Sequence, residues 1–288
     1  MSVLDSCTTT QPSELNGRGE YRDRRPMSKV PSKHDFRKPV DQRERWADFH
    51  LLGQIEWEAV WALQRRLVFE ASGDDAPRIT VLFCEHQDLI TVGRNGSRSH
   101  IRLSDEQLRR ERIRVRWVGR GGGCVFHTPG QLCVYPIASL TACEWSVGEF
   151  LQRFRSGLQR ALAELGVSSQ IRSGNHNLWG RSGMLAAMGV AVQHWVTCHG
   201  AFLNVSPCMS RFTHIDAIDP NALGRGEKPI LSSLFAERRL AIRMTSVRAA
   251  LVGGLTAAFD CTCHHIHSGH PLLRSSIGKT RERIARAS

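Results

Sequence analysis

Apolar residues recur at helical spacing in three separate stretches of the chain. In residues 52–70, 147–165 and 246–259, an apolar side chain returns every three to four positions, which places these side chains on one helix face. A shorter stretch, 103–112, is rich in charged residues around two leucines. The pattern therefore predicts three amphipathic helices and one short surface helix.

Short runs rich in β-branched residues separate these helices. They predict strands at residues 79–84, 89–92, 113–118, 131–136, 185–197 and 201–205. We expect a turn at His199 and Gly200 to join the last two strands, because glycine often marks a turn. Strands follow one another in pairs more often than they alternate with helices. This order favours an α+β fold with a mixed sheet flanked by helices.

The two ends of the chain differ in composition from the middle. Residues 1–46 are polar, with four prolines and charges of both signs, and they contain too few apolar residues to offset the entropy of ordering. We expect a disordered basic extension there. Order is expected to begin near Trp46, with one folded domain over residues 47–260 and a Cys/His-rich, basic tail over residues 261–288.

The chain of 288 residues has a formal net charge of +12. Such an excess favours an acidic partner: nucleic acid, an anionic membrane or an acidic protein. The arginines lack interleaved aromatic residues, which argues against nucleic acid. No run reaches the roughly 18 apolar residues of a membrane span, and the first ten residues do not resemble a signal peptide. Nine cysteines without the tight spacing of a secreted scaffold indicate free thiols and a cytoplasmic protein.

The run from Arg120 to Gln131 carries the strongest local signal for a binding site. Its three consecutive glycines allow backbone N–H groups to approach an oxygen-rich ligand. Arg120 can pair with a carboxylate or phosphate, and His127 can orient a carbonyl or move a proton. A glycine hairpin with one solubilising arginine is the alternative. The run is not a Walker loop, because no Gly-Lys-Ser/Thr follows.

This run resembles the R-G-G-x-x-T-Y-H-G-P-G-Q hallmark of the octanoyltransferase family and departs from it at Val125, Phe126 and Thr128. Three further segments resemble family segments and follow the family's order: residues 85–94, 177–190 and 195–205. Together the resemblance covers about residues 51–259. It identifies the chain as a divergent member of that family.

The resemblance implies a fold akin to the catalytic domains of biotin and lipoate protein ligases, and it implies no cofactor. In the family, an octanoyl group passes from acyl carrier protein to an enzyme cysteine and then to a lysine of a lipoyl domain. The cysteine thiolate attacks one thioester and forms a second, which the amine then opens. A nearby lysine lowers the pKa of the thiol. The implied substrate-binding residues are Arg120, Gly121, Gly122, Gly123, Cys124, Val125, Phe126, His127, Ala187, Met188, Gly189, Gly200, Ala201 and Phe202.

The chain departs from the family at the reacting groups. Met184 stands where the family has the lysine, and Ile218 stands where it has the cysteine. Phe202 replaces a small alanine beside the acyl pocket. The sequence therefore indicates an octanoyltransferase relative that is inactive or weakly active by the usual route, or a non-catalytic relative that binds an acyl chain or acyl carrier protein. Cys208 and Cys124 are the candidates for a displaced nucleophile, and core filling is their alternative role.

A second cluster, between Cys261 and His270, contains two thiols and four imidazoles. These are ligands that Zn²⁺ and Cu⁺ accept. Their spacing matches no standard zinc finger, so we predict no metal site there.

Overall fold

The computed structural model describes residues 44–172, 176–216 and 229–273. The strands in these ranges are β1 (Trp46–Gln54), β2 (Arg78–Glu85), β3 (Leu89–Val92), β4 (Arg114–Trp117), β5 (Cys124–His127), β6 (Gln131–Ala138), β7 (Gln170–Ile171), β8 (Leu178–Trp179), β9 (Met184–Gln193), β10 (Val196–Asn204) and β11 (Cys263–Ser268). The helices are α1 (Trp57–Ser72), α2 (Asp105–Arg110), α3 (Val147–Glu164), α4 (Leu234–Arg238) and α5 (Met244–Ala258), with short 3-10 helices η1 (Arg98–His100) and η2 (Met209–His214).

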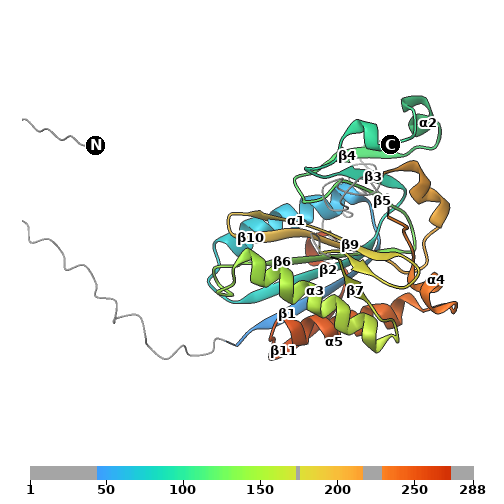
Figure 1. The fold of residues 1–288 in the computed structure, drawn as a ribbon. Helices are drawn as coiled ribbons and strands as arrows, with labels where there is room; N and C mark the ends of the chain where they lie inside the picture. The colour runs from blue at the N-terminus through green and yellow to red at the C-terminus, as the bar shows by residue number, and fades with distance from the viewer. Residues whose placement is uncertain (1–43, 173–175, 217–228, 274–288) are drawn as a thin grey trace, which may run out of the picture. The chain divides into compact units, whose positions relative to one another are not determined.

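Eight strands form one mixed sheet in the order β11-β1-β2-β6-β10-β9-β8-β7 (Figure 1). Strand β1 runs parallel to both of its neighbours, and the remaining pairs are antiparallel. A separate three-stranded sheet has the order β4-β3-β5. This mixed sheet with helices confirms the predicted α+β class.

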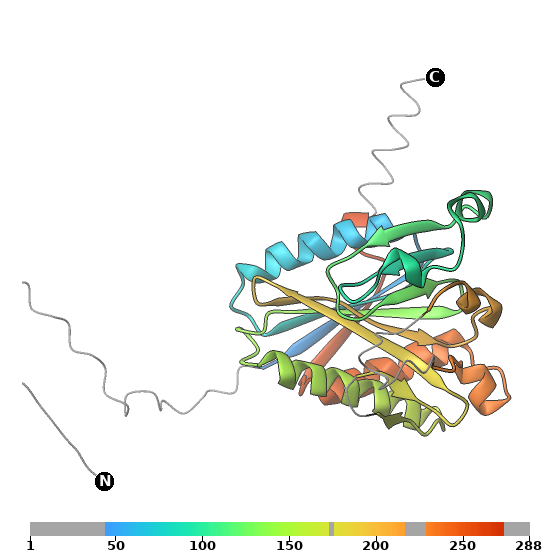
Figure 2. The same ribbon diagram turned by 45° about the horizontal axis from the view of Figure 1, so that its top comes forward.

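Helices cover both faces of the large sheet. Figure 2 shows α1 on one face and the pair α3 and α5 on the other. The α3–α5 interface is built on stacked rings, with 5.9 Å between the centroids of Phe150 and Phe154 and 6.1 Å between those of Phe150 and Phe259. A Cβ on Gly157 would lie 2.7 Å from Leu255 Cδ2, so glycine allows α5 to approach α3 this closely.

The first predicted helix begins later than its apolar spacing indicated. Residues from Trp46 to Gln54 form β1, and α1 begins at Trp57. Ala47 and Phe49 of β1 are fully buried in the core. The helical spacing of Leu52 with the residues of α1 is therefore coincidental, because pairing with β2 and β11 determines the local backbone.

The predicted turn at His199 and Gly200 is wrong, because both residues lie inside β10. The β9–β10 hairpin turns at His194 and Trp195, which have φ angles of 50° and 59°. A Cβ at position 200 would lie 1.9 Å from the carbonyl oxygen of Val134 on β6. Glycine is therefore required there by the close approach of a neighbouring strand.

The ends of the chain fall largely outside the described residues. This holds for nearly all of the predicted extension 1–46 and for residues 274–288. Strand β11, which lies within the predicted tail, pairs with β1 at the edge of the large sheet. No helix in the described ranges has both the length and the apolar character needed to cross a membrane.

Candidate functional site

The three segments that the sequence assigned to a substrate cradle lie against one another. The glycine-rich loop is anchored to β9 by a hydrogen bond from Gly121 N to Val190 O, 3.0 Å long. A Cβ on Gly189 would lie 2.7 Å from Gly121 O, so the loop rests on this glycine. The register of β10 on β9 sets Phe202 opposite Ala187 and Ala201 opposite Met188. We call this junction the cradle.

Arg120 is the buried cation of the cradle, only 1% exposed. Its Nη2 donates to the carbonyl oxygen of Thr91 at 3.0 Å and to its Oγ1 at 2.8 Å, and its Nη1 donates to Gly121 O at 3.0 Å. The guanidinium carbon lies 5.2 Å from the ring centroid of Phe202. Burial lowers the pKa of Arg120 to about 10, so the side chain remains charged at neutral pH. None of the ion pairs among the described residues involves it.

A chain of hydrogen bonds determines the tautomer of His127. Gln131 Nε2 donates to Asn204 Oδ1 at 3.0 Å and to Phe126 O at 3.2 Å. Gln131 Oε1 therefore accepts from His127 Nδ1–H, at 3.0 Å. Thr91 Oγ1 already accepts from Arg120, so its hydroxyl proton is directed to His127 Nε2, at 2.9 Å. Both ring nitrogens are thus occupied.

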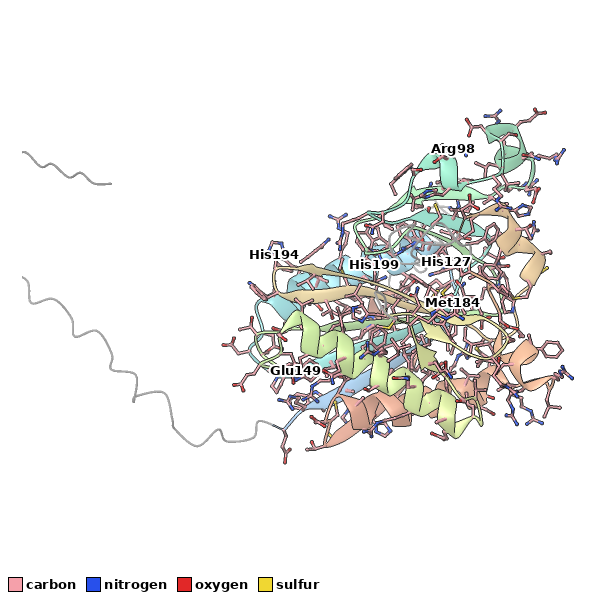
Figure 3. The ribbon with its side chains drawn as sticks, viewed as in Figure 1. Arg98, His127, Glu149, Met184, His194 and His199 are labelled. Atoms are coloured by element: carbon pink, nitrogen blue, oxygen red, sulfur yellow. The ribbon has the colours of Figure 1, made fainter. Side chains whose placement is uncertain are left out.

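The two buried histidines of the cradle are neutral at neutral pH. Burial lowers the pKa of His127, and it lowers that of His199 to about 3. The His199 ring stacks on Trp61 of α1 with 4.7 Å between centroids. Figure 3 shows His127 and His199 inside the fold, with Arg98 and His194 at the periphery. Neither imidazole can act as the cation that lowers the pKa of a thiol.

Opposite this polar network the cradle is apolar and almost filled. Met184 is 3% exposed and packs against Trp179, Ala187 and Leu231. The remaining cavity has a volume of about 20 Å³, and its lining residues are Cys124, Val125, Phe126, Gln131, Met184, Ala187, Phe202, Asn204, Phe212, Ile215 and Leu231. A single water molecule needs roughly 10–15 Å³, so this conformation has no room for an acyl chain.

Phe202 is the side chain that fills the centre of the cradle. Its ring meets His127 edge-on with 4.9 Å between centroids, and Tyr135 with 6.2 Å. Arg120 lies over the same ring. The ring therefore separates the buried cation from the apolar cavity.

The two candidate thiols occupy different environments. Cys124 is buried, its thiol donates to Ser97 O at 3.8 Å, and burial raises its pKa. Cys208 is exposed at the start of η2, and a hydrogen bond with the Ser210 hydroxyl lowers its pKa. Cys208 therefore forms a thiolate more readily than Cys124 does. Ile218 lies outside the described residues.

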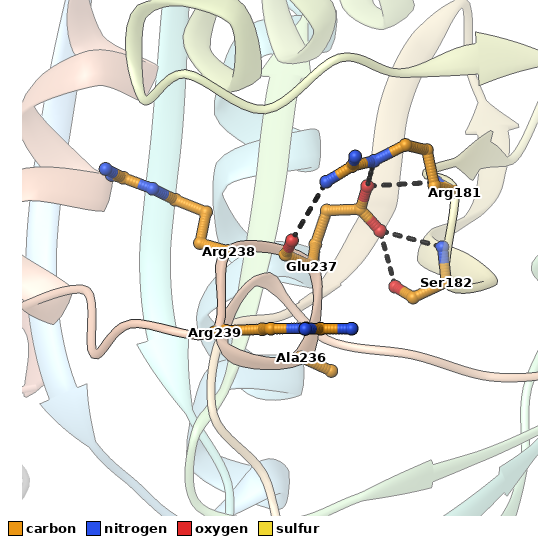
Figure 4. A pocket seen from close by; sticks show the side chains of 6 residues that line it. All are labelled: Arg181, Ser182, Ala236, Glu237, Arg238 and Arg239. Atoms are coloured by element: carbon orange, nitrogen blue, oxygen red, sulfur yellow. Dashed lines mark hydrogen bonds and ion pairs between the residues drawn. The ribbon is translucent and has the colours of Figure 1, made fainter.

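A carboxylate fixes the turn that leads into Met184. Glu237 of α4 accepts hydrogen bonds from Arg181 N at 3.0 Å, from Ser182 N at 2.8 Å and from the Ser182 hydroxyl (Figure 4). Burial opposes ionisation, but the bonds from Ser182 and Arg181 outweigh it and lower the pKa of Glu237 to about 2. A hollow of about 530 Å³ beside it is rimmed by Arg181, Arg238 and Arg239.

Sequence reasoning did not assign the residues that complete the cradle. Thr91, Gln131 and Asn204 all stand inside the quoted motifs, yet their roles depend on side-chain directions that a motif does not specify. Glu237 belongs to no motif, and its role as a hydrogen-bond acceptor for the turn is visible only in the folded structure.

The fold and this loop-on-strand cradle define a catalytic domain of the lipoate protein ligase type. A bipartite lipoate protein ligase from Thermoplasma acidophilum superposes with a TM-score of 0.63 at 13% identity, covering 82% of this chain and 91% of that one. A lipoate-protein ligase A bound with ATP gives a TM-score of 0.62 at 13% identity, covering 81% and 93%.

The family model "Lipoyl protein ligase A/B catalytic domain" matches residues 57–251. An octanoyltransferase from Roseiflexus sp. (strain RS-1) is 33% identical over 213 residues, which cover 73% of this chain and 85% of that protein. One from Geobacter metallireducens is 32% identical over 220 residues, covering 76% and 97%. The chain therefore belongs to the octanoyltransferase family, as its motifs predicted.

Proposed function

We propose that this chain is an octanoyltransferase relative that binds an acidic partner of the family, acyl carrier protein or a lipoyl domain, without transferring octanoyl by the thioester route. The observation that carries the proposal is the filled apolar half of the cradle. Met184 is buried there among apolar side chains, beside a cavity of about 20 Å³.

The absence of a thiol and an ammonium group at the family's two reacting positions supports this proposal. The thioester route needs a nucleophilic thiolate and a cation that stabilises it. At the two positions that resemble these groups the chain has Ile218 and Met184. An isoleucine forms no thioester, and a methionine carries no charge. The two neutral histidines of the cradle do not replace the missing cation.

The surface beside the turn that leads into Met184 supports binding of an acidic partner. Arg181, Arg238 and Arg239 border the hollow beside this turn, and Figure 4 shows Arg238 pointing away from Glu237. The same stretch exposes Ile230, at 73%, together with Phe235 and Leu240. Arginines interspersed with exposed apolar side chains suit a small acidic domain, and the net charge of +12 steers such a domain toward the surface.

Intact mass spectrometry tests the catalytic half of the proposal. The protein is incubated with octanoyl-acyl carrier protein, and its mass is measured before and after hydroxylamine treatment, which cleaves thioesters. We expect no added octanoyl group and no transfer to a lipoyl domain. A hydroxylamine-labile octanoyl adduct on the wild-type chain would disprove the proposal.

Calorimetry tests the binding half with acyl carrier protein and a lipoyl domain as separate titrants. We expect one of them to bind, more weakly as salt rises, because screening reduces the attraction. Arg238→Glu should weaken binding strongly. Arg160→Glu, the same charge change at an exposed position on α3, is the matched control and should have little effect. No binding of either titrant at low salt would exclude a partner-binding role.

Cys208 supports a second candidate function, slow acyl transfer through a displaced nucleophile. Its exposure and lowered pKa make it the more reactive of the two candidate thiols. Under this alternative, the wild-type chain acylates itself and Cys208→Ser does not. Cys263→Ser, at another exposed cysteine, is the control and should still be acylated.

A further inference from the structure

A cluster of metal-ligating side chains lies buried beneath the cradle, where β2 pairs with β6. Cys84 and Cys133 are cross-strand partners, and His86 follows β2 directly. All three residues are almost completely buried. The two sulfur atoms and one ring nitrogen of His86 all lie within 4.8 Å of one another. No step of the proposed function uses these thiols.

The histidine of this cluster is already oriented as a ligand. His86 Nδ1 lies 2.8 Å from the carbonyl oxygen of Ile55, which can only accept, so Nδ1 carries the proton. Nε2 then faces Cys84 Sγ at 3.6 Å and the Tyr135 hydroxyl at 3.1 Å. In a metal-binding histidine, the ring nitrogen that does not bind the metal usually donates to an acceptor such as a backbone carbonyl, which fixes the orientation of the ring.

The two thiols differ in pKa. Burial raises the pKa of Cys84 well above its usual value. Burial also acts on Cys133, but the hydrogen bond from Cys84 and the nearby His86 outweigh it and hold the pKa of Cys133 well below the usual value. A metal binds the thiolate form of cysteine, so zinc would displace the remaining thiol protons when it binds.

We propose that Cys84, His86 and Cys133 bind a zinc ion, with the Tyr135 hydroxyl as the nearest fourth donor. Bond lengths of about 2.0 Å to nitrogen and 2.3 Å to sulfur place the ligand atoms of a tetrahedral zinc site roughly 3.5 Å apart. The cluster therefore needs only a small contraction. Two thiolates neutralise Zn²⁺, so the filled site carries no net charge into the core.

This site is closed and lies under the polar network of the cradle. Cys133 Sγ is 3.7 Å from His127 Nδ1, and Tyr135 packs against Phe202. A buried site without an open position is typical of structural zinc. We therefore expect zinc to stabilise the fold, and this inference does not depend on the proposed function.

The test uses the full chain, purified under reducing conditions and stripped with a chelator. Zinc added back should bind in a 1:1 ratio to the chain and raise Tm. Cobalt in its place should produce thiolate-to-metal charge-transfer absorption and the intense visible bands of tetrahedral coordination. Cys84→Ser and Cys133→Ser should each abolish the cobalt spectrum and the zinc-dependent rise in Tm.

Two control variants separate this site from other ligands. Cys198→Ser removes a buried thiol of the same apolar layer and should leave the cobalt spectrum unchanged. His265→Asn with His267→Asn removes imidazoles that lie near Asp48 at the sheet edge, and it should also leave the charge-transfer band unchanged.

Three outcomes overturn the proposal. The first is a stripped wild-type chain with reduced thiols that gives no thiolate–cobalt band. The second is a band that persists in Cys84→Ser. The third is a Cys84–Cys133 disulfide in the chain as isolated, seen as a mass lower by two hydrogens. If both serine variants fail to fold, the wild-type cobalt spectrum and zinc content decide the question alone.

Discussion

The polar half and the apolar half of the cradle are stabilised by different interactions, hydrogen bonds in the first and close packing in the second. In the polar half, each side chain from Arg120 through Thr91 and His127 to Gln131 and Asn204 is held by at least one hydrogen bond. In the apolar half, Met184 and Phe202 fill space among apolar neighbours. A buried polar network is costly unless its members are paired, whereas an apolar half tolerates any well-packed set of side chains.

Under the proposed function, this difference explains how a family site can lose its chemistry and keep its shape. The polar half ties the glycine-rich loop to β3 through the bonds from Arg120 to Thr91, and we expect the fold to need these bonds whether or not a substrate binds. Under the proposed function, Met184 takes the place of the family lysine in the apolar half without leaving a buried charge unpaired. Each of the following substitutions tests this division.

Met184→Lys should have the largest effect, a loss of about 4 kcal/mol in the free energy of unfolding at neutral pH, equal to roughly three pKa units. Among the described residues, the lining of the apolar half includes no carboxylate partner for the new ammonium, so we expect the pKa of the lysine to fall in the folded state. The deficit should therefore shrink as pH rises toward about 10, the pKa of lysine in an unfolded chain. Denaturant unfolding at several pH values measures this. Met184→Leu should cost little, and a deficit that does not change with pH would show that the site accommodates the charge.

Phe202→Ala should cost about 3 kcal/mol, because it leaves a cavity in a buried layer. Octanoate should recover part of this loss by occupying the space, seen as a rise in Tm. Phe154→Ala, in the α3–α5 core, should cost a similar amount without any response to octanoate. Equal responses of the two variants would show that the ring does not block an acyl slot.

Gln131→Leu should cost about 2 kcal/mol, because it leaves His127 Nδ1–H without its acceptor and Asn204 Oδ1 without its donor. The comparison is Gln64→Leu, which removes a buried amide that accepts from His199 N. We expect the first variant also to shift the NMR signals of the glycine-rich loop and the second to leave them in place.

Glu237→Gln should have the smallest effect at neutral pH, about 1–2 kcal/mol. Because the folded-state pKa of Glu237 is near 2 and its ordinary value is 4.5, the carboxylate stabilises the fold above pH 4.5. That contribution disappears as pH falls toward 2. Wild type and variant should therefore converge in stability under acid, whereas the exposed Glu106→Gln should follow wild type throughout.

The elements that could be predicted from the sequence are those whose pattern is local. The helix predicted at 147–165 became α3 (Val147–Glu164), because one face of phenylalanines and leucines packs on α5 and the sheet. The β9–β10 turn was missed because His194 and Trp195 adopt positive φ without glycine or asparagine. Strand β5 was missed because it follows the glycines directly.

The cradle was predictable in its segments but not in its contacts. The motifs correctly grouped the glycine-rich loop with β9 and β10, since glycine marks close approach of backbones. The pairing of Cys84 with Cys133 depends on the register between β2 and β6. A single sequence does not specify that register, so two cysteines about fifty residues apart are unremarkable until the strands are aligned.

Strand β11 makes completion of the sheet a late event in biosynthesis. It pairs with β1, the first described strand, and hydrogen bonds between Thr262 and Arg45 close a sequence separation of 217 residues. On the ribosome, the outer edge of β1 stays unpaired until the whole domain has emerged. Such non-local closure slows folding and leaves an open strand edge accessible to other nascent chains. The newly made chain therefore exposes this edge of β1 until its last described strand has been synthesised.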